Sequence, residues 1–172
     1  MKNPISPTSH ERLLRDEDFI VSKTDTKGRI TYANPIFMEI AGYEERELLG
    51  KQHNVVRHPD MPRAVFDLMW KTLKQGSEFF GYVKNMAKDG SFYWTFANVT
   101  ASYDNDGQLV GYYSVRRMPR RAAVEVLTDV YAQMSRIERE QGPKNGMEHA
   151  TKYLLDLVLR EHEDYTRFVL SL

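Results

Sequence analysis

Five stretches of the chain carry the apolar, aromatic and β-branched residues that are typical of strands. They lie at residues 18–25, 29–33, 79–84, 91–102 and 108–117. Turn signals separate neighbouring stretches: Gly28 follows the first, and Asp-Gly pairs at 89–90 and 106–107 follow the third and fourth. The pattern predicts a hairpin near the N-terminus and three consecutive antiparallel strands later in the chain.

Helical spacing fills the interval between these two groups of strands. Asn34 is suited to cap a helix that Pro35 begins, and Gly42 is suited to end it. A second short helix is expected over residues 44–49. A longer one is expected over 61–74, where apolar residues recur every three or four positions. The order β-β-α-α-α-β-β-β predicts an α+β fold with an antiparallel sheet.

The composition changes after Pro119. Helices are expected over residues 120–140 and 147–172, with Gly142-Pro143 and Asn145-Gly146 as the break between them. Their apolar stripes suit packing within the chain and a dimer interface equally well. We therefore divide the chain into a flexible segment at 1–15, a domain at 16–118 and a helical segment at 119–172.

The composition excludes several classes of protein. The 172 residues include 24 Lys and Arg, 24 Asp and Glu, and no Cys. Without cysteine there is no disulfide, thiol nucleophile or thiolate metal site, and the balanced charge argues against a general nucleic-acid binder. The sequence lacks an apolar run of about eighteen residues and a signal-peptide core. We expect a cytoplasmic protein without direct membrane insertion.

The densest polar cluster is at residues 52–60, where His53, Arg57, His58 and Asp60 lie close together. One interpretation is a surface loop in which Asp60 caps the next helix. The other is a polar wall that faces a ligand, because Arg and His donate charge-assisted hydrogen bonds to a phosphate or an electron-rich ring. The spacing of the two histidines matches no common metal motif, so no metal site is expected.

Aromatic residues, Trp94 among them, gather on the last three predicted strands. Strand alternation places Phe79, Gly81, Val83 and Asn85 on one face. Aromatic residues alone are typical of a core or an interface. A buried Asn at a strand end must find partners, and its amide can pair with the edge of an imide-type ring. No catalytic triad, carboxylate pair or phosphate loop is present, so the sequence does not indicate an enzyme.

The order of elements resembles that of a PAS domain. Five motifs share this resemblance: Asn34-Pro-Ile-Phe37, Gly42-Tyr43, Glu47-Leu-Leu-Gly50, Lys88-Asp-Gly90 and Gly111-Tyr-Tyr-Ser114. Three further features resemble the PAS domains of bacterial aerotaxis receptors more closely: the stretch HNVVRHPDMP at residues 53–62, Trp70 and Val83-Lys-Asn85. The resemblance covers about residues 16–118. It implies a PAS fold, a five-stranded antiparallel sheet with helices on one face, that holds FAD non-covalently and reports its redox state.

The resemblance also implies site residues. Positions important for flavin binding or signalling in the aerotaxis family match Asn34, Arg57, His58, Asp60, Phe66 and Asn85. The related light sensors have a reactive Cys at the position of His53, so their thiol adduct cannot form here. Their imide-binding Asn matches Asn85, and their glutamine near flavin N5 matches Arg116. Their phosphate-binding arginines fall near Asn54 and Arg63. Phe79 replaces a Trp of the aerotaxis receptors.

The resemblance predicts that the flavin ring lies between the sheet and the helices at residues 34–74. Val83 and Val99 would pack the ring, and Asn85 would bind its pyrimidine edge. Arg57 or His58 would offset negative charge, whereas Arg63 and Trp70 would lie toward the pyrophosphate and adenine. Reduction would turn a ring acceptor into a donor beside Arg116, at the end of the last strand, and so act on the C-terminal helices. The full expected set is Asn34, His53, Asn54, Arg57, His58, Asp60, Arg63, Phe66, Trp70, Phe79, Val83, Asn85, Trp94 and Arg116.

The sequence stops after two helices, without the membrane and methyl-accepting segments of aerotaxis receptors. It resembles in this respect the split systems in which a soluble PAS protein works with a separate transducer. We expect a homodimer and a chemotaxis-type transducer or other signalling protein as partner. Two alternatives remain open: a haem gas sensor with His53 or His58 as axial ligand, and a ligand-free PAS module that serves dimerisation.

Overall fold

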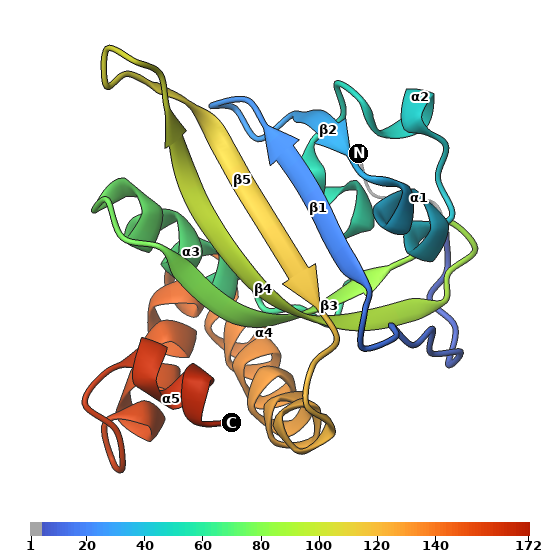
Figure 1. Ribbon diagram of the computed structural model, residues 1–172. Coiled ribbons are helices and arrows are strands. Elements are labelled where there is room, and N and C mark those ends of the chain that lie inside the picture. The colour runs from blue at the N-terminus through green and yellow to red at the C-terminus, as the bar shows by residue number, and fades with distance from the viewer. Residues whose placement is uncertain (1–4) are drawn as a thin grey trace.

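The computed structural model describes residues 5–172 and contains one five-stranded sheet (Figure 1). Its strands are β1 (Phe19–Thr24), β2 (Ile30–Ala33), β3 (Phe79–Met86), β4 (Phe92–Tyr103) and β5 (Leu109–Arg117). They lie in the order β2-β1-β5-β4-β3, and every neighbouring pair is antiparallel. The α+β arrangement with an antiparallel sheet is therefore confirmed.

Short helices cover one face of this sheet (Figure 1). They are α1 (Pro35–Ala41), α2 (Glu45–Leu48), the 3-10 turn η1 (His53–Val56) and α3 (Arg63–Lys74). Asn34 begins α1 as predicted, because its side chain accepts a hydrogen bond from the Phe37 amide at 3.1 Å. Gly42 ends the helix with φ of 71°, in the left-handed region that glycine tolerates best. Phe37 is fully buried beneath the sheet.

The C-terminal helices lie at the β3 edge of the sheet. They are α4 (Arg121–Val158) and α5 (Tyr165–Ser171). The expected break at residues 142–146 is a kink inside α4, where Gly142 alone leaves helical geometry with φ of 72° and ψ of 179°. Pro143 follows the kink directly, where its missing N–H breaks no helical bond.

The expected continuous helix over residues 147–172 is wrong between α4 and α5. A polar run at residues 160–164 interrupts the apolar pattern there. Asp164 then starts a new helix by accepting a hydrogen bond from the Arg167 amide at 2.8 Å. The restart lets Phe168 and Val169 of α5 bury their side chains in the main core.

The N-terminal segment, expected to be flexible over residues 1–15, runs along the start of β4 from residue 8 to residue 12. The Thr8 amide donates to the Gly90 carbonyl at 2.8 Å, and the Arg12 amide to the Phe92 carbonyl at 2.7 Å. A side chain at Gly90 would lie 2.3 Å from the Ser6 carbonyl oxygen, so only glycine allows this approach. Residues 1–4 lie outside the described residues.

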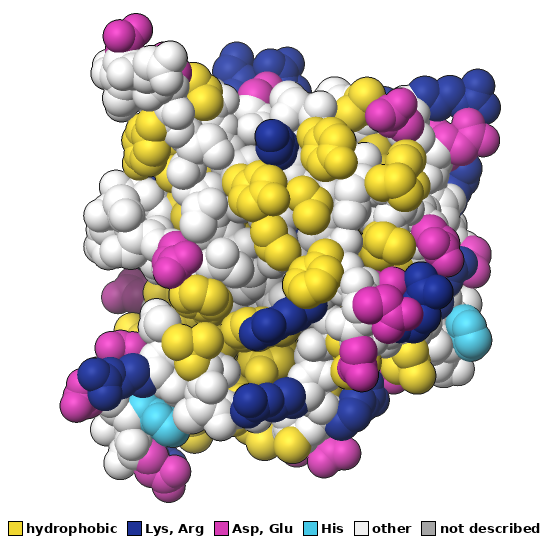
Figure 2. All heavy atoms as spheres, in the orientation of Figure 1, with side chains coloured by type: hydrophobic (Ala, Val, Ile, Leu, Met, Phe, Trp, Pro, Cys, Tyr) yellow, Lys and Arg dark blue, Asp and Glu magenta, His cyan; other side chains and the backbone are white. Residues whose placement is uncertain are grey.

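The other face of the sheet carries apolar side chains, which Figure 2 shows gathered over the strands. Phe19 and Tyr32 are 48% and 43% exposed there. The Lys23 ammonium lies 5.9 Å and 5.8 Å from the ring centres of Tyr32 and Tyr113. Within residues 5–172, no helix combines the length and the apolar character that crossing a bilayer requires.

Candidate functional site

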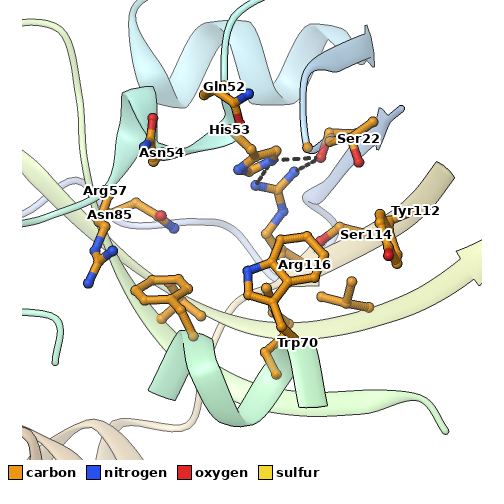
Figure 3. Close-up of a pocket in the computed structure, with 17 residues that line it drawn as sticks. Ser22, Gln52, His53, Asn54, Arg57, Trp70, Asn85, Tyr112, Ser114 and Arg116 are labelled. Carbon is orange, nitrogen blue, oxygen red and sulfur yellow. Dashed lines mark hydrogen bonds between the residues drawn. The ribbon is translucent and has the colours of Figure 1, made fainter. Parts of the chain in front are cut away.

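A cavity of about 250 Å³ lies between the sheet and the segment that contains η1 and α3 (Figure 3). Its lining comprises Ser22, Thr24, Gly28, Gln52, His53, Asn54, Arg57, Phe66, Met69, Trp70, Val83, Asn85, Ala97, Val99, Tyr112, Ser114 and Arg116. The strand residues in this set stand two apart, because side chains on one face of a strand alternate. No Asp or Glu belongs to the lining among the residues that the structure describes.

Arg116 is the most deeply buried cation of the cavity. Its guanidinium donates to Ser22 Oγ at 2.5 Å and to His53 Nε2 at 3.3 Å, and it lies 4.6 Å from the centre of the Phe37 ring. Ser22 Oγ is also 3.0 Å from His53 Nε2. Burial lowers the pKa of Arg116 to about 10, so the side chain stays charged at neutral pH.

His53 is the neutral member of this group. Burial and the neighbouring Arg116 charge lower the pKa of its imidazole to about 3. Its Nε2 faces the Arg116 donor and therefore acts as an acceptor, which places the ring proton on Nδ1. His53 thus orients Arg116 without carrying a charge of its own.

Three buried polar atoms of cavity-lining residues have no partner among residues 5–172: the Thr24 hydroxyl, Asn85 Nδ2 and Arg116 Nε, and the last two are pure donors. Asn85 is 4% exposed and Arg116 is 3% exposed, so bulk water does not satisfy these groups. An unsatisfied buried donor is unfavourable by about 1–3 kcal/mol. Both lie in the wall of the same cavity, which is therefore built to present hydrogen-bond donors to an acceptor-rich molecule.

Arg57 supplies a second positive charge. Its backbone pairs with that of Asn85, which holds the loop against β3. Its guanidinium lies 4.3 Å from the centre of the Phe66 ring. Burial lowers the pKa of Arg57, and the nearby Glu138 carboxylate opposes that shift. In Figure 3, Arg57 and Asn85 lie at one side of the cavity and Ser22, Ser114 and Tyr112 at the other.

The structure places eight of the fourteen predicted site residues around this cavity: His53, Asn54, Arg57, Phe66, Trp70, Val83, Asn85 and Arg116. Trp70 meets Tyr112 edge to face, with 5.0 Å between ring centres. Val83 and Asn85 reach the cavity because they share a face of β3. The other six lie outside the lining.

Three of those six belong to the loop and helix start at residues 58–63. His58 is buried against Phe92, and its Nδ1 accepts a hydrogen bond from the Asp60 amide at 3.1 Å. The Asp60 carboxylate pairs with the Lys84 ammonium at 2.7 Å. Arg63 points to Glu138 of α4, with 3.3 Å between Nε and the carboxylate. These contacts shape the wall behind the cavity.

The remaining three pack or cap structural elements. Asn34 accepts from the Val21 and Phe37 amides and donates to the Phe19 carbonyl, so all its bonds join β1 to α1. Phe79 shares the face of Val83 but stacks on Tyr165 of α5, with ring centres 5.7 Å apart. Trp94 stacks on Tyr131 of α4.

The sequence argument missed several lining residues: Ser22, Thr24, Gly28, Gln52, Met69, Ala97, Tyr112 and Ser114. Counting back by twos from Arg116 along β5 would have found Ser114 and Tyr112. Nothing local distinguishes Ser22, because its place depends on β1 lying beside β5, where it pairs with Ser114. Within residues 5–172, no three His, Asp or Glu side chains gather to hold a metal ion.

An antiparallel sheet in the order β2-β1-β5-β4-β3, with a cavity between one face and short helices, defines an α+β domain with an internal ligand-sized site. Residues 30–116 match the family model described as the PAS fold, and the chain belongs to this family. The family expected from the sequence is confirmed.

Curated relatives and solved structures agree with this assignment. The chain is 40% identical over 124 residues to the aerotaxis receptor of Escherichia coli strain K12, which covers 72% of this chain and 24% of the receptor. It is 33% identical over 97 residues to a nitrogen fixation regulatory protein of Klebsiella pneumoniae, which covers 56% of this chain and 20% of that protein. The chain thus spans a quarter or less of the length of these relatives.

A solved light-oxygen-voltage domain, studied with a flavin analogue, superposes with a TM-score of 0.56 at 24% identity. The match covers 64% of this chain and 83% of that one. This structural similarity supports the assignment of the fold.

Proposed function

We propose that this chain binds FAD non-covalently between its sheet and α3, and that it senses redox state and relays it through its C-terminal helices. One observation carries the proposal. The cavity wall holds the unpartnered buried donors Asn85 Nδ2 and Arg116 Nε and the unpartnered Thr24 hydroxyl, a second guanidinium from Arg57, and no acidic residue in its described lining. An electron-rich ring with carbonyl acceptors along one edge satisfies such a wall.

The size of the cavity suits the ring part of a flavin. Its volume of about 250 Å³ is just below the range, from about 300 Å³, that is usual for small-molecule pockets. The phosphates and adenine would therefore extend to the rim, where Gln52 and Asn54 are exposed and Trp70 offers an aromatic surface. FAD, rather than another flavin, is favoured because the sequence resembles the aerotaxis family most closely.

Each cavity residue has a role toward the bound ring. Asn85 donates to its carbonyl edge, and Arg57 and Arg116 offset negative charge. Phe66, Met69 and Trp70 of α3 exclude water. A bound flavin would supply a redox centre whose hydrogen-bonding pattern changes with its oxidation state. His53 and Ser22 hold Arg116 ready to respond to that change.

Arg116 also lies where a response can leave the cavity. It stands one residue before the end of β5, and Pro119 and α4 follow within five residues. A movement of its guanidinium acts directly on the strand that leads into α4. We propose that α4 and α5 pass this movement to a chemotaxis-type transducer or another signalling protein, and that the chain acts as a homodimer.

The geometry disfavours haem as the ligand. His58 does not line the cavity, and its Nδ1 is engaged by the Asp60 amide. His53 lines the cavity but directs Nε2 at Ser22 and Arg116. His58 therefore stands outside the cavity lining and His53 Nε2 is engaged by protein groups, so neither nitrogen is presented to the cavity as an axial ligand. The unpartnered donors likewise disfavour a ligand-free module.

The experiment is to purify the protein and to identify its chromophore. The protein should be yellow and should release FAD on denaturation, whereas colourless protein that cannot be reconstituted with FAD would refute the proposal. Asn85→Ala should weaken FAD binding by about tenfold or more, which corresponds to about 1.4 kcal/mol. Asn98→Ala is the matched control, because Asn98 lies on the next strand and bonds to Glu78 outside the cavity. Equal losses in both variants would remove Asn85 from its role.

Two measurements test the relay and the dimer. Reduction of the bound FAD should change amide exchange in residues 121–158, and unchanged exchange would contradict a relay through these helices. Light scattering should report a dimer of the full chain. A monomeric chain with FAD bound would refute the homodimer and would leave the proposal of FAD binding intact.

A further inference from the structure

One face of α4 holds the domain through three polar side chains, Tyr131, Ser135 and Glu138. They are spaced four and three residues apart, so they stand on one side of the helix. Tyr131 Oη donates to the Tyr82 carbonyl at 2.8 Å, and Ser135 Oγ donates to the Asp60 carbonyl at 3.2 Å. The three side chains thus contact β3, the loop at 58–62 and α3.

Glu138 makes the most concentrated of these contacts. Its carboxylate accepts from the Ala64 amide at 2.8 Å, from the Arg63 amide at 3.2 Å and from Arg63 Nε at 3.3 Å. It is 8% exposed. A carboxylate is rarely buried unless it is paired and hydrogen-bonded, as this one is.

This carboxylate lies at the first turn of α3. The residue that precedes α3 is Pro62, which has no side-chain hydrogen bond to offer the free amides. Glu138 supplies the missing cap from a different part of the chain, and its negative charge favours the positive end of the helix. The N-terminus of α3 is therefore completed by α4.

The helix so capped is a wall of the cavity. Phe66 and Trp70 follow the capped turn at once, and both line the cavity. Arg57 rests on Phe66, and Glu138 acts electrostatically on Arg57. Phe66 lies within one helical turn of the contact with α4, and Trp70 lies within two.

The kink in α4 fixes the place of Glu138. Beyond Gly142 the helix turns back, and Gly146 packs against the backbone of Glu138. A β-carbon at residue 146 would lie 2.6 Å from the Glu138 carbonyl oxygen and 2.9 Å from its α-carbon. Because the returning half of α4 touches Glu138 itself, this half moves with the contact to α3.

We propose that Glu138 is a positioning residue that couples occupancy of the cavity to docking of the C-terminal helices. The inference rests on the proposed function in taking FAD as the occupant. FAD orders Phe66 and Trp70 on α3, and Glu138 holds the first turn of that helix against α4. Coupling between two sites is reciprocal, so loss of the Glu138 contact also weakens FAD binding.

The test uses the full chain and compares Glu138→Ala and Glu138→Gln with wild type. Glu140→Ala is the matched control, because Glu140 lies on the same helix, is exposed and, within residues 5–172, pairs only with Arg136. FAD titration measures the Kd. Amide exchange is measured on residues 63–66 and 143–158, with and without FAD. Glu138→Gln keeps the size of the side chain and provides a folded variant if the alanine variant unfolds.

In wild type and Glu140→Ala, FAD should slow exchange in residues 143–158. In Glu138→Ala this protection should disappear and the Kd should rise by about fivefold or more, the lower end of ordinary allosteric coupling. In Glu138→Gln, the Kd and the FAD-dependent protection should lie between those of wild type and those of Glu138→Ala, because glutamine keeps an acceptor and loses the charge. An unchanged Kd together with unchanged FAD-dependent protection in Glu138→Ala would overturn the inference.

Failure of the proposed function has a different signature. If wild type binds no FAD, the choice of ligand is wrong. The contact between Glu138 and α3 is then tested by amide exchange without ligand. Glu138→Ala should speed exchange in residues 63–66 and in residues 143–158 together. Faster exchange confined to α4 would show that Glu138 does not hold α3, and would overturn the inference independently.

Discussion

The cavity and the contact with α4 share α3 and the loop before it, yet they treat buried polar groups differently. At the contact, Tyr131, Ser135 and Glu138 each have a partner in the domain. In the cavity, Asn85 Nδ2 and Arg116 Nε have none among the described residues. A buried polar group without a partner is unfavourable, and the contact made by these three side chains of α4 carries no such deficit, whereas the cavity wall does. The difference distinguishes the surface that the chain completes by itself from the surface that a ligand completes.

Replacing the buried cation gives the largest expected effect. Arg116→Met should weaken FAD binding by about tenfold or more. It should leave the apoprotein about equally stable, because removing a buried charge that has no carboxylate partner offsets the loss of the hydrogen bonds to Ser22 and His53. FAD titration and urea unfolding measure the two effects. Arg117→Met is the control, since Arg117 is exposed and rests on Phe96. A stability loss with full FAD affinity would make Arg116 a structural residue.

Acidification should weaken the fold through two histidines whose pKa values are lowered, His58, which is buried, and His53, which is partly buried. Burial and the Lys84 charge lower the pKa of His58 to about 4, while burial and Arg116 lower the pKa of His53 to about 3. The unfolded chain binds these protons near pH 6.5. Stability is therefore complete above about pH 6.5 and falls toward pH 4, by up to about 1.4 kcal/mol per pH unit for each histidine.

Urea unfolding of the apoprotein between neutral pH and pH 4 measures this slope. His58→Asn keeps an acceptor for the Asp60 amide but cannot titrate, so its slope should be smaller. The same slope in His58→Asn and wild type would mean that His58 does not contribute to the pH dependence.

Asn34 provides a test of a polar side chain whose hydrogen-bond partners all lie within the protein. Asn34→Ala removes a helix cap and two further bonds between β1 and α1, so the free energy of unfolding should fall by roughly 1–2 kcal/mol. The folded variant should bind FAD with the wild-type Kd, as measured by titration at low denaturant. A loss of FAD affinity without a loss of stability would return Asn34 to the binding site.

Gly146 gives the smallest expected effect. Alanine is ordinarily more favourable than glycine inside a helix by about 1 kcal/mol. Here its β-carbon would collide with the Glu138 backbone, and we expect a net loss of about 1 kcal/mol. Asn145→Ala, at the adjacent exposed position, should gain a few tenths of a kcal/mol. Urea unfolding compares the two, and a stabilised Gly146→Ala would show that the two halves of α4 separate readily.

The fold could be predicted from local signals because those signals agree with the tertiary structure. Asn34-Pro35 and Gly42 bound α1, and the Asp-Gly turns separate β3, β4 and β5. The C-terminal helices were less predictable. The polar run at residues 160–164 contains the helix formers Arg160, Glu161 and Glu163, so the pattern alone did not reveal that Asp164 starts a new helix, which buries Phe168 and Val169 in the core.

The site could be predicted where chemistry and alternation coincide. Asn85 and Arg116 are polar residues on strand positions that face inward, and both reach the cavity. His58, Asp60 and Arg63 have the same types of side chain, but protein groups engage them from Phe92, Lys84 and Glu138. Those partners lie between about 24 and 75 residues away in the sequence. Local patterns do not reveal such distant partners.

The placement of α4 bears on how the two edges of the sheet avoid pairing with other chains. At one edge, β2 has only four residues. At the other, β3 has eight, and its outer side is occupied at three positions. Tyr131 binds the Tyr82 carbonyl, Met61 Sδ accepts from the Lys84 amide, and the Arg57 backbone pairs with that of Asn85. A domain cut after residue 118 would lose the first of these and uncover part of a long edge strand. Self-association of such a fragment would report strand pairing rather than a signalling dimer.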